Sequence, residues 1–179
     1  MLMMWTKRLR WSRLEGRGQA LVELAITAPV LLTMLLGICE LGNAYNAHLS
    51  LVAAAREGAR LAARGGVYTD DAMRQVIVLH AGSLDLAGDG SIVVTWIKSD
   101  AGGFTSYTTR TLLGTASSKF SAAELAALQQ AATGSDPAYL GKEGIAVVEV
   151  FYNYRTLTNL LGRTFPMYSY TIMPISAPS

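Results

Sequence analysis

A small residue and a carboxylate stand close together where a basic N-terminal stretch meets an apolar run, in the segment RGQALVE at residues 17–23. A carboxylate at the start of a membrane-length helix costs roughly 2–3 kcal/mol on insertion scales, so Glu23 needs a specific partner. Cleavage between Gly18 and Gln19 would give every subunit a new terminal amino group and would place Glu23 at the fifth position of the mature chain. The amino group of a neighbouring subunit could then pair with Glu23. This spacing indicates an assembly component and not an enzyme.

The basic residues gather before this site. Residues 1–18 carry five positive side chains, at positions 7, 8, 10, 13 and 17, against the single carboxylate of Glu15. The whole chain of 179 residues has a formal charge of +2, with 15 Lys and Arg against 13 Asp and Glu. Removing residues 1–18 leaves 10 against 12, or −2. A mature chain of that charge has no electrostatic footprint for nucleic acid, so we exclude nucleic acid as a partner.

The apolar run is long enough to cross a membrane. Residues 24–39 contain no charged side chain, and the wider stretch 19–41 would form ~34 Å of helix. Because the positive charges precede the run, the positive-inside rule predicts a cytoplasmic N-terminus and an extracytoplasmic C-terminal part. Pro29 removes one helical hydrogen bond in the middle of the run and predicts a kink there.

The helix is expected to continue beyond the membrane. Apolar residues recur at spacings of three and four as far as the Gly65-Gly66 pair, which predicts a helix of about 45 residues over positions 19–64. The expected apolar stripe consists of Leu41, Tyr45, Leu49, Val52, Ala55, Ala59 and Ala62. Arg56, Arg60 and Arg64 form a row on another face, with Glu57 three residues before Arg60.

Residues 65–179 predict one extracytoplasmic α+β domain, after a basic cytoplasmic leader at 1–18 and the membrane-spanning and extended helix at 19–64. We expect a three-stranded or larger antiparallel sheet, with the long helix or its tail against one face. Strands are predicted at 91–98, 144–156 and 167–173, and helices at 70–83, with Asp70 as its cap, and after the capping-box spacing at 121–124. Residues 88–90 predict a turn, and residues 100–118 a hairpin or a long exposed loop.

Other side chains offer little chemistry. His48 and His80 are the only histidines, and we expect His80 to be a partly buried, hydrogen-bonded imidazole. Residues 85–90 begin like a calcium loop, but the middle oxygen ligand is missing and Trp96 stands where the final Glu belongs. Cys39 is the only cysteine, and it is expected to be a small buried hydrophobe. The sequence predicts no cofactor, no metal and no enzyme.

Four tyrosines at strand spacing have two interpretations. They are Tyr152, Tyr154, Tyr168 and Tyr170. Packing in or on the sheet is the favoured interpretation, and a surface that binds glycans or other subunits is the less favoured one.

The N-terminal third resembles the TadE-like family, small pseudopilin-like membrane proteins of the Tad (tight adherence) systems that assemble Flp pili. The resemblance covers about residues 16–64 and rests on the order and spacing of its residues. They are Gly18, Ala20, Val22, Glu23, Ala25, Pro29, the Leu-rich run to Gly37, Glu40, Gly42 and residues 54–60. Two positions depart from related pilins. Leu24 stands where major Flp pilins usually carry an aromatic residue, and Gln19 where the commonest type IV pilins have Phe.

The resemblance implies a minor pseudopilin-like protein of Tad/Flp-type pilus assembly, adherence or associated secretion. It implies cleavage after Gly18 by a prepilin peptidase and a subunit-packing role for Glu23. The implied partners are that peptidase, other pilins or pseudopilins, the Tad inner-membrane machinery and membrane lipid. The implied place is the bacterial cytoplasmic (inner) membrane, as a single-pass protein, and incorporation into a pilus stays open.

Two other functions compete with this one. An uncleaved, signal-anchored extracytoplasmic binding or scaffold module unrelated to pili explains the span and its orientation equally well. It does not explain Gly18, Glu23 or the Ala-rich extension of the helix. A secreted enzyme with a cleaved signal has less support, since the run is longer than a signal-peptide h-region and lacks a good small-x-small site behind it.

Overall fold

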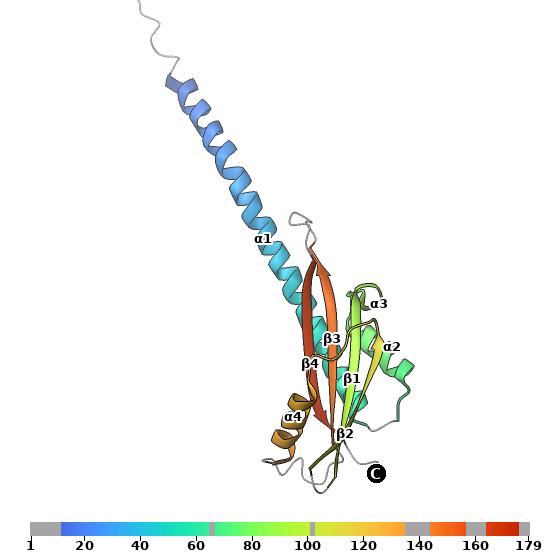
Figure 1. The fold of residues 1–179 in the computed structure, drawn as a ribbon. Helices are drawn as coiled ribbons and strands as arrows, with labels where there is room; N and C mark the ends of the chain where they lie inside the picture. The colour runs from blue at the N-terminus through green and yellow to red at the C-terminus, as the bar shows by residue number, and fades with distance from the viewer. Residues whose placement is uncertain (1–11, 65–66, 101–102, 135–143, 157–163, 176–179) are drawn as a thin grey trace, which may run out of the picture. The chain divides into compact units, whose positions relative to one another are not determined.

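The computed structural model describes residues 12–64, 67–100, 103–134, 144–156 and 164–175, and its fold is α+β, as the sequence predicts (Figure 1). The chain divides into two compact units, Met1–Gly42 and Asn43–Ser179, and the first helix contributes residues to both. The elements in chain order are α1 (Ser12–Ala62), α2 (Asp70–His80), α3 (Leu86–Asp89), β1 (Gly90–Asp100), β2 (Gly103–Leu113), α4 (Ala122–Gly134), β3 (Gly144–Arg155) and β4 (Thr164–Pro174).

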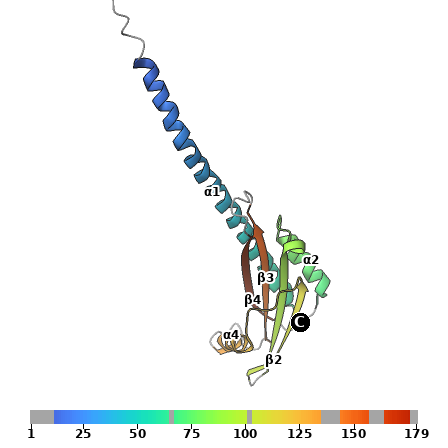
Figure 2. The ribbon, with the colours of Figure 1, turned by 45° about the horizontal axis from the view of Figure 1, so that its top comes forward.

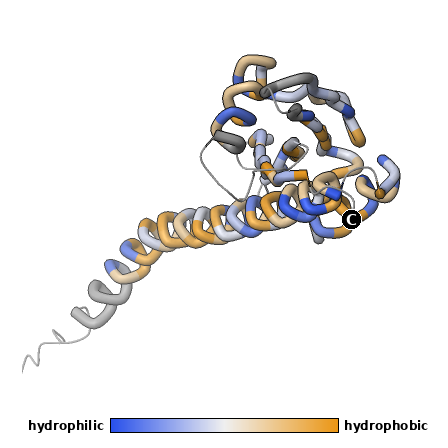
Figure 3. Tube along the Cα trace, turned by 90° about the horizontal axis from the view of Figure 1, so that it is seen from below, coloured by the Kyte–Doolittle hydropathy of each residue, from blue (hydrophilic) through white to orange (hydrophobic). Residues whose placement is uncertain are grey.

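The first part of α1 is an apolar helix whose side chains are mostly exposed in the described structure. Gly18–Ala62 is long and apolar enough to cross a membrane, and none of its most apolar 18-residue window is buried. Figure 3 shows the apolar colouring of this part of the helix. Most of the large side chains here are exposed by more than half, as Leu21, Ile26 and Ile38 illustrate. These properties are consistent with a single-pass membrane anchor.

The sheet is antiparallel and has four strands in the order β2-β1-β3-β4 (Figures 1 and 2). β1 and β2 form a hairpin, so residues 100–118, predicted as a hairpin or a long exposed loop, contain instead one strand that pairs with β1 and adds a fourth strand to the sheet. β1 pairs with β3 in a register that sets Trp96 opposite Ala146, and β3 pairs with β4. The two central strands are therefore β1 and β3, and both are buried on both faces over most of their length.

One face of the sheet is covered by residues 43–62 of α1 and by α2. Strand residues of alternating position supply the sheet side of this core, namely Ile92, Val94, Ala146, Val148 and Val150. On the helix side the buried residues are mostly small: Ala47, Leu51, Ala54, Ala55, Gly58, Ala59, Leu61 and Ala62. Small side chains let the helix backbone come close to the sheet, which increases dispersion contacts along the whole interface.

The predicted stripe of α1 is wrong in its first half. Ala55, Ala59 and Ala62 are buried as predicted, but Leu41, Tyr45 and Leu49 are 73%, 63% and 47% exposed. The face of α1 that packs on the sheet is the one with alanine and glycine, because the helix can come close to the sheet only where its side chains are small. Spacings of three and four are satisfied by two adjacent faces, and the sequence pattern alone favoured the one with the larger side chains.

Four local predictions also change. Thr69, and not Asp70, caps α2, since its Oγ1 accepts a hydrogen bond from the Ala72 N–H at 3.2 Å. α2 ends at His80, whose side chain is exposed, although its Nδ1 lies 2.9 Å from the Val76 carbonyl oxygen. The predicted turn at 88–90 is instead the end of α3 and the start of β1.

The opposite face carries a second, smaller core under α4. Ile97, Ile145 and Val147 of the sheet meet Leu125 of α4 there. The predicted capping box of α4 is confirmed, because the Ser121 N–H donates to a Glu124 carboxylate oxygen at 2.8 Å and the Glu124 N–H to Ser121 Oγ at 3.3 Å. These bonds hold the pKa of Glu124 below its usual value, since the Ser121 backbone and hydroxyl both favour the ionised carboxylate.

Gly58 is a point of close approach between α1 and the rest of this core. A Cβ atom at this position would lie 2.8 Å from Ile77 Cδ1 and 3.1 Å from Val148 Cγ1. We therefore expect Gly58→Val to lower the free energy of unfolding by about 1–3 kcal/mol through overpacking. Urea unfolding of the detergent-solubilised chain, followed by circular dichroism, measures the change. The matched control is Gly42→Val, where the space around an added Cβ is open, and equal losses in the two variants would contradict the packing argument.

Candidate processing and assembly site

The predicted cleavage point lies inside a helix. α1 begins at Ser12, so the peptide bond between Gly18 and Gln19 is helical, whereas the sequence placed the helix start at residue 19. An added Cβ at Gly18 would meet no atom within 4 Å, and the side chains of Gln19 and Ala20 are exposed. Residues 18–20, at and just after the predicted cleavage point, are therefore exposed.

Glu23 is an isolated carboxylate on an apolar helix. Its side chain is exposed, and within the described part of the chain its carboxylate makes no hydrogen bond or ion pair. The neighbours Val22 and Leu24 are both 60% exposed, so the carboxylate is surrounded by unburied apolar surface. Such a group is costly in hydrocarbon, and a cationic partner at this depth would offset the cost.

The spacing of Gln19 and Glu23 indicates where such a cationic partner could lie. Residues i and i+4 lie on the same face of an α-helix, about 6 Å apart along the axis. A chain that begins at Gln19 therefore carries its amino group on the face of Glu23, one turn nearer the N-terminus. A carboxylate so close to a helix N-terminus is also favoured by the helix dipole.

Pro29 lies inside α1, and the helix continues on both sides of it. Two threonine hydroxyls of the apolar stretch bond to the helix itself. Thr27 Oγ1 donates to the Glu23 carbonyl oxygen and Thr33 Oγ1 to the Pro29 carbonyl oxygen, each at 2.8 Å. Their polar groups are thus satisfied without water, as a membrane requires. Cys39, which we expected to be buried, is exposed on this helix, because the apolar run has no protein partner within the described chain.

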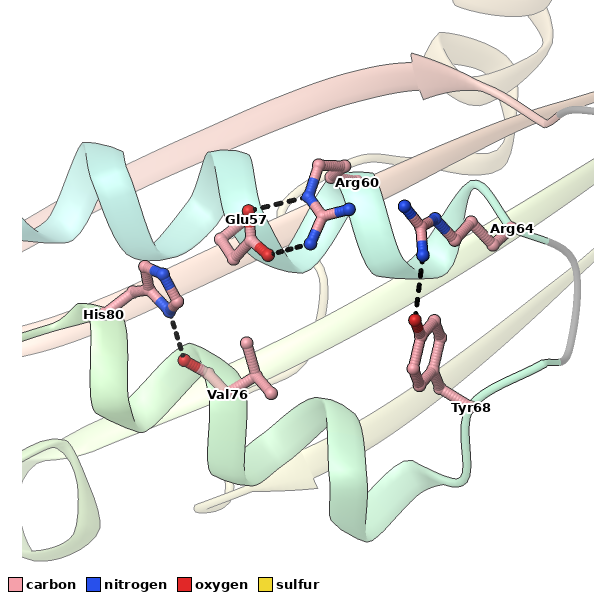
Figure 4. A network of polar contacts seen from close by, with 6 residues as sticks. All are labelled: Glu57, Arg60, Arg64, Tyr68, Val76 and His80. Atoms are coloured by element: carbon pink, nitrogen blue, oxygen red, sulfur yellow. Dashed lines mark hydrogen bonds and ion pairs between the residues drawn. The ribbon is translucent and has the colours of Figure 1, made fainter.

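Two arginines of the predicted row, Arg60 and Arg64, make polar contacts at the end of α1 and in the segment that leads to α2 (Figure 4). Arg60 Nε donates to Glu57 at 2.8 Å, and Arg64 Nη1 donates to the Tyr68 hydroxyl oxygen at 2.8 Å. The hydrogen bond from Arg60 is the largest cause that holds the pKa of Glu57 below its usual value. Because that pKa is lowered, this pair stabilises the fold at neutral pH and its contribution is lost as the pH falls through the range where Glu57 protonates.

The sequence missed a buried carboxylate on the sheet. Glu149 of β3 is 0% exposed, and it accepts hydrogen bonds from Ser118 Oγ, from the Lys119 N–H at 2.9 Å and from the Tyr168 hydroxyl at 2.8 Å. The Lys119 ammonium lies 4.0 Å from the centroid of the Tyr168 ring. Burial and the bond to Glu149 raise the pKa of Tyr168 well above its usual value. Side chains alternate along β3, so Glu149 shares a face with Ile145 and Val147, and this position among apolar residues was the available signal.

This carboxylate has the contacts of a structural group. All its donors come from the segment before α4 and from β4, so the network fastens both to the centre of the sheet. Tyr168 and Tyr170 stack on this face with ring centroids 5.8 Å apart, and Tyr154 on β3 is buried. These positions agree with the packing interpretation of the tyrosines.

In the segment at residues 85–90 that begins like a calcium loop, both carboxylates bind other groups of the protein. Asp85 Oδ1 accepts from the Gly88 N–H at 3.0 Å as the cap of α3, and Asp89 pairs with Arg155 at 2.7 Å. Among the described residues, no group of three or more His, Cys, Asp or Glu side chains could hold a metal ion.

Comparison with known proteins gives one match. Residues 18–60 match the family described as TadE-like protein, so the matched segment begins at Gly18, includes Glu23 and ends in the arginine row. No curated protein and no solved structure is significantly similar to the chain.

Proposed function

The chain carries a TadE-like domain at residues 18–60, which associates it with Tad pilus systems, and from this we propose that it is a minor pseudopilin-like membrane protein in the assembly of Tad/Flp-type pili. The observation that carries the proposal is the isolated carboxylate of Glu23, which lies at the start of an uncovered apolar helix and one helical turn after Gln19. The proposed role is structural and not catalytic.

The membrane arrangement follows from the charges. α1 crosses the inner membrane once, residues 1–18 stay in the cytoplasm with their five basic side chains, and the sheet domain lies outside. Pro29, in the middle of the span, bends the helix, because its ring removes one backbone hydrogen bond.

Processing then creates the assembly contact. A prepilin peptidase cuts after Gly18, and the new ammonium group of Gln19 becomes available to another subunit. Glu23 of one chain pairs with this ammonium of its neighbour. The pair joins two costly charges in one charge-assisted hydrogen bond, and its position fixes the axial register of the two helices.

The experiment for processing is N-terminal mass spectrometry of the membrane-bound protein, with and without its prepilin peptidase. We expect a peptide that begins at Gln19 only where the peptidase is present. A Gly18→Leu variant should keep its leader, because a bulky residue then occupies the predicted cleavage point, and Gly42→Leu, a glycine beyond the apolar run, serves as its control. An intact leader in both samples would instead favour an uncleaved signal anchor unrelated to pili.

A further inference from the structure

Strand β4 forms one edge of the sheet. It is the last strand in the order β2-β1-β3-β4, and among the described strands it pairs only with β3 (Figure 2). The Ile175 N–H donates to the Gly144 carbonyl oxygen at 2.9 Å, so these two residues form a hydrogen-bonded pair at the end of the ladder. Such pairs recur at every second residue, and the odd residues of β4 therefore bond to β3. The N–H and carbonyl groups of Tyr168, Tyr170 and Ile172 point away from β3.

Two prolines agree with this register. Pro166 and Pro174 are also even residues, so the N–H group that each one lacks would have pointed outward, and no bond to β3 is lost. Between the prolines, the outer side of β4 has three N–H donors, with carbonyl oxygens at the same residues. Within the described part of the chain, these outward backbone groups make no hydrogen bond. An edge of this kind can accept another strand.

β4 differs from the other edge of the sheet, strand β2. The pairing of β2 with β1 has two irregularities, and β2 carries the charge of Arg110. β4 has an unbroken register with β3, no charged side chain in its sequence TFPMYSYTIMP, and a central residue, Tyr170, that is 49% exposed. Bulges and charges protect an edge strand from further pairing, so β4 is the edge that is open to it.

We propose that β4 binds an extended segment of a different polypeptide, which adds a further strand to the sheet along residues 167–173. The backbone identifies this occupant, because donors and acceptors that repeat at every second residue match those of an extended chain. The segment covers about seven residues, the usual length of a strand. It should carry no charged side chain toward the sheet, since β4 offers no opposite charge on either face.

A second copy of this chain fits the edge less well. Two β4 strands that pair antiparallel are related by a twofold axis perpendicular to the sheet, so residues 43–62 of α1 would run in opposite directions in the two copies. Such a pair does not suit two chains whose α1 helices are anchored in one membrane. The β2 edge of another copy has the irregularities and the charge described above. The inference concerns the sheet domain and does not depend on the role proposed for Glu23.

The test places the photo-crosslinking amino acid p-benzoylphenylalanine at position 170 of the full chain, expressed in its native cells. We expect an adduct with another protein. Ile172→Pro, which removes one outward N–H and adds a ring at the edge, should lower the yield of this adduct about tenfold or more. Ile172→Ala loses the same side chain but keeps the N–H, and its yield should stay within about twofold of the parent chain. The same probe at position 79 on α2, where Leu79 is 74% exposed, should give no adduct that depends on Ile172→Pro.

Two measurements support the interpretation of these yields. Thermal unfolding of the solubilised variants verifies that both are folded. In the solubilised parent chain, without a partner, the amides of Tyr170 and Ile172 should exchange hydrogen about tenfold or more faster than those of Ser169 and Thr171, which bond to β3. Mass spectrometry of the adduct should identify a partner segment that is free of charged residues over about seven positions.

Four results would overturn the proposal. They are no adduct at position 170, equal yields in the proline and alanine variants, equal exchange of the odd and even amides, or a crosslinked segment with charges toward the sheet. An adduct between two copies of this chain would assign the edge to self-association and would equally exclude the proposed occupant. None of these outcomes bears on cleavage after Gly18, so the pilus role and the edge pairing can fail separately.

Discussion

Glu23→Ala is expected to leave membrane insertion intact and to lower incorporation into pilus assemblies at least about 30-fold, because truncating one partner of a buried charge pair costs about 2–5 kcal/mol. Insertion persists because removing a carboxylate from the apolar run makes the span more favourable. The chain is counted by immunoblot in the carbonate-resistant membrane fraction and in sheared or co-purified pilus complexes. The ratio of these two amounts is the measured quantity.

Two further variants make the test specific to charge and position. Glu23→Gln keeps the size of the side chain and removes its charge, so it should behave like Glu23→Ala. Glu40→Gln changes the carboxylate at the other end of the apolar run, where no new terminus is near, and should assemble normally. Unchanged piliation in both Glu23 variants would refute the proposed pairing, whatever the result of the cleavage experiment.

Glu149→Ala is expected to have the largest effect on stability. It leaves three buried or half-buried donors without an acceptor, from Ser118, Lys119 and Tyr168. Each such donor costs about 1–3 kcal/mol, so we expect the free energy of unfolding to fall by about 3–5 kcal/mol after partial relaxation. Urea unfolding of the solubilised full chain, followed by circular dichroism, gives the value.

The conservative change at the same position separates hydrogen bonding from packing. Glu149→Gln keeps one acceptor oxygen for Lys119 and Tyr168 and can donate to Ser118, so its loss should be about half as large. Glu124→Ala removes a carboxylate from the exposed start of α4 and should have a small effect. A loss for Glu149→Ala no larger than that of Glu124→Ala would show that the buried network does not stabilise the sheet.

The sequence by itself determined the features that depend on neighbours along the chain. The uncharged run at 24–39 indicates a helix that is apolar enough to cross a membrane, because membrane partition depends on local composition. The alternation of β3 assigns Val148 and Val147 to opposite faces, and the spacing of Ser121 and Glu124 gives the start of α4. Each of these signals is complete within a few residues, so no tertiary contact was needed to read it.

Only the tertiary structure decided what depends on residues far apart in the chain. The alanine and glycine face of α1 packs on the sheet. This choice of face depends on distant residues, because the close packing at Gly58 involves Ile77 and Val148. Glu149 has two donors about 30 residues earlier in the chain and a third, Tyr168, 19 residues later, and Arg110 pairs with Asp70 across 40 residues. A local pattern records which residues are apolar or charged, whereas the choice of partner is made by shape and charge complementarity when the elements pack together.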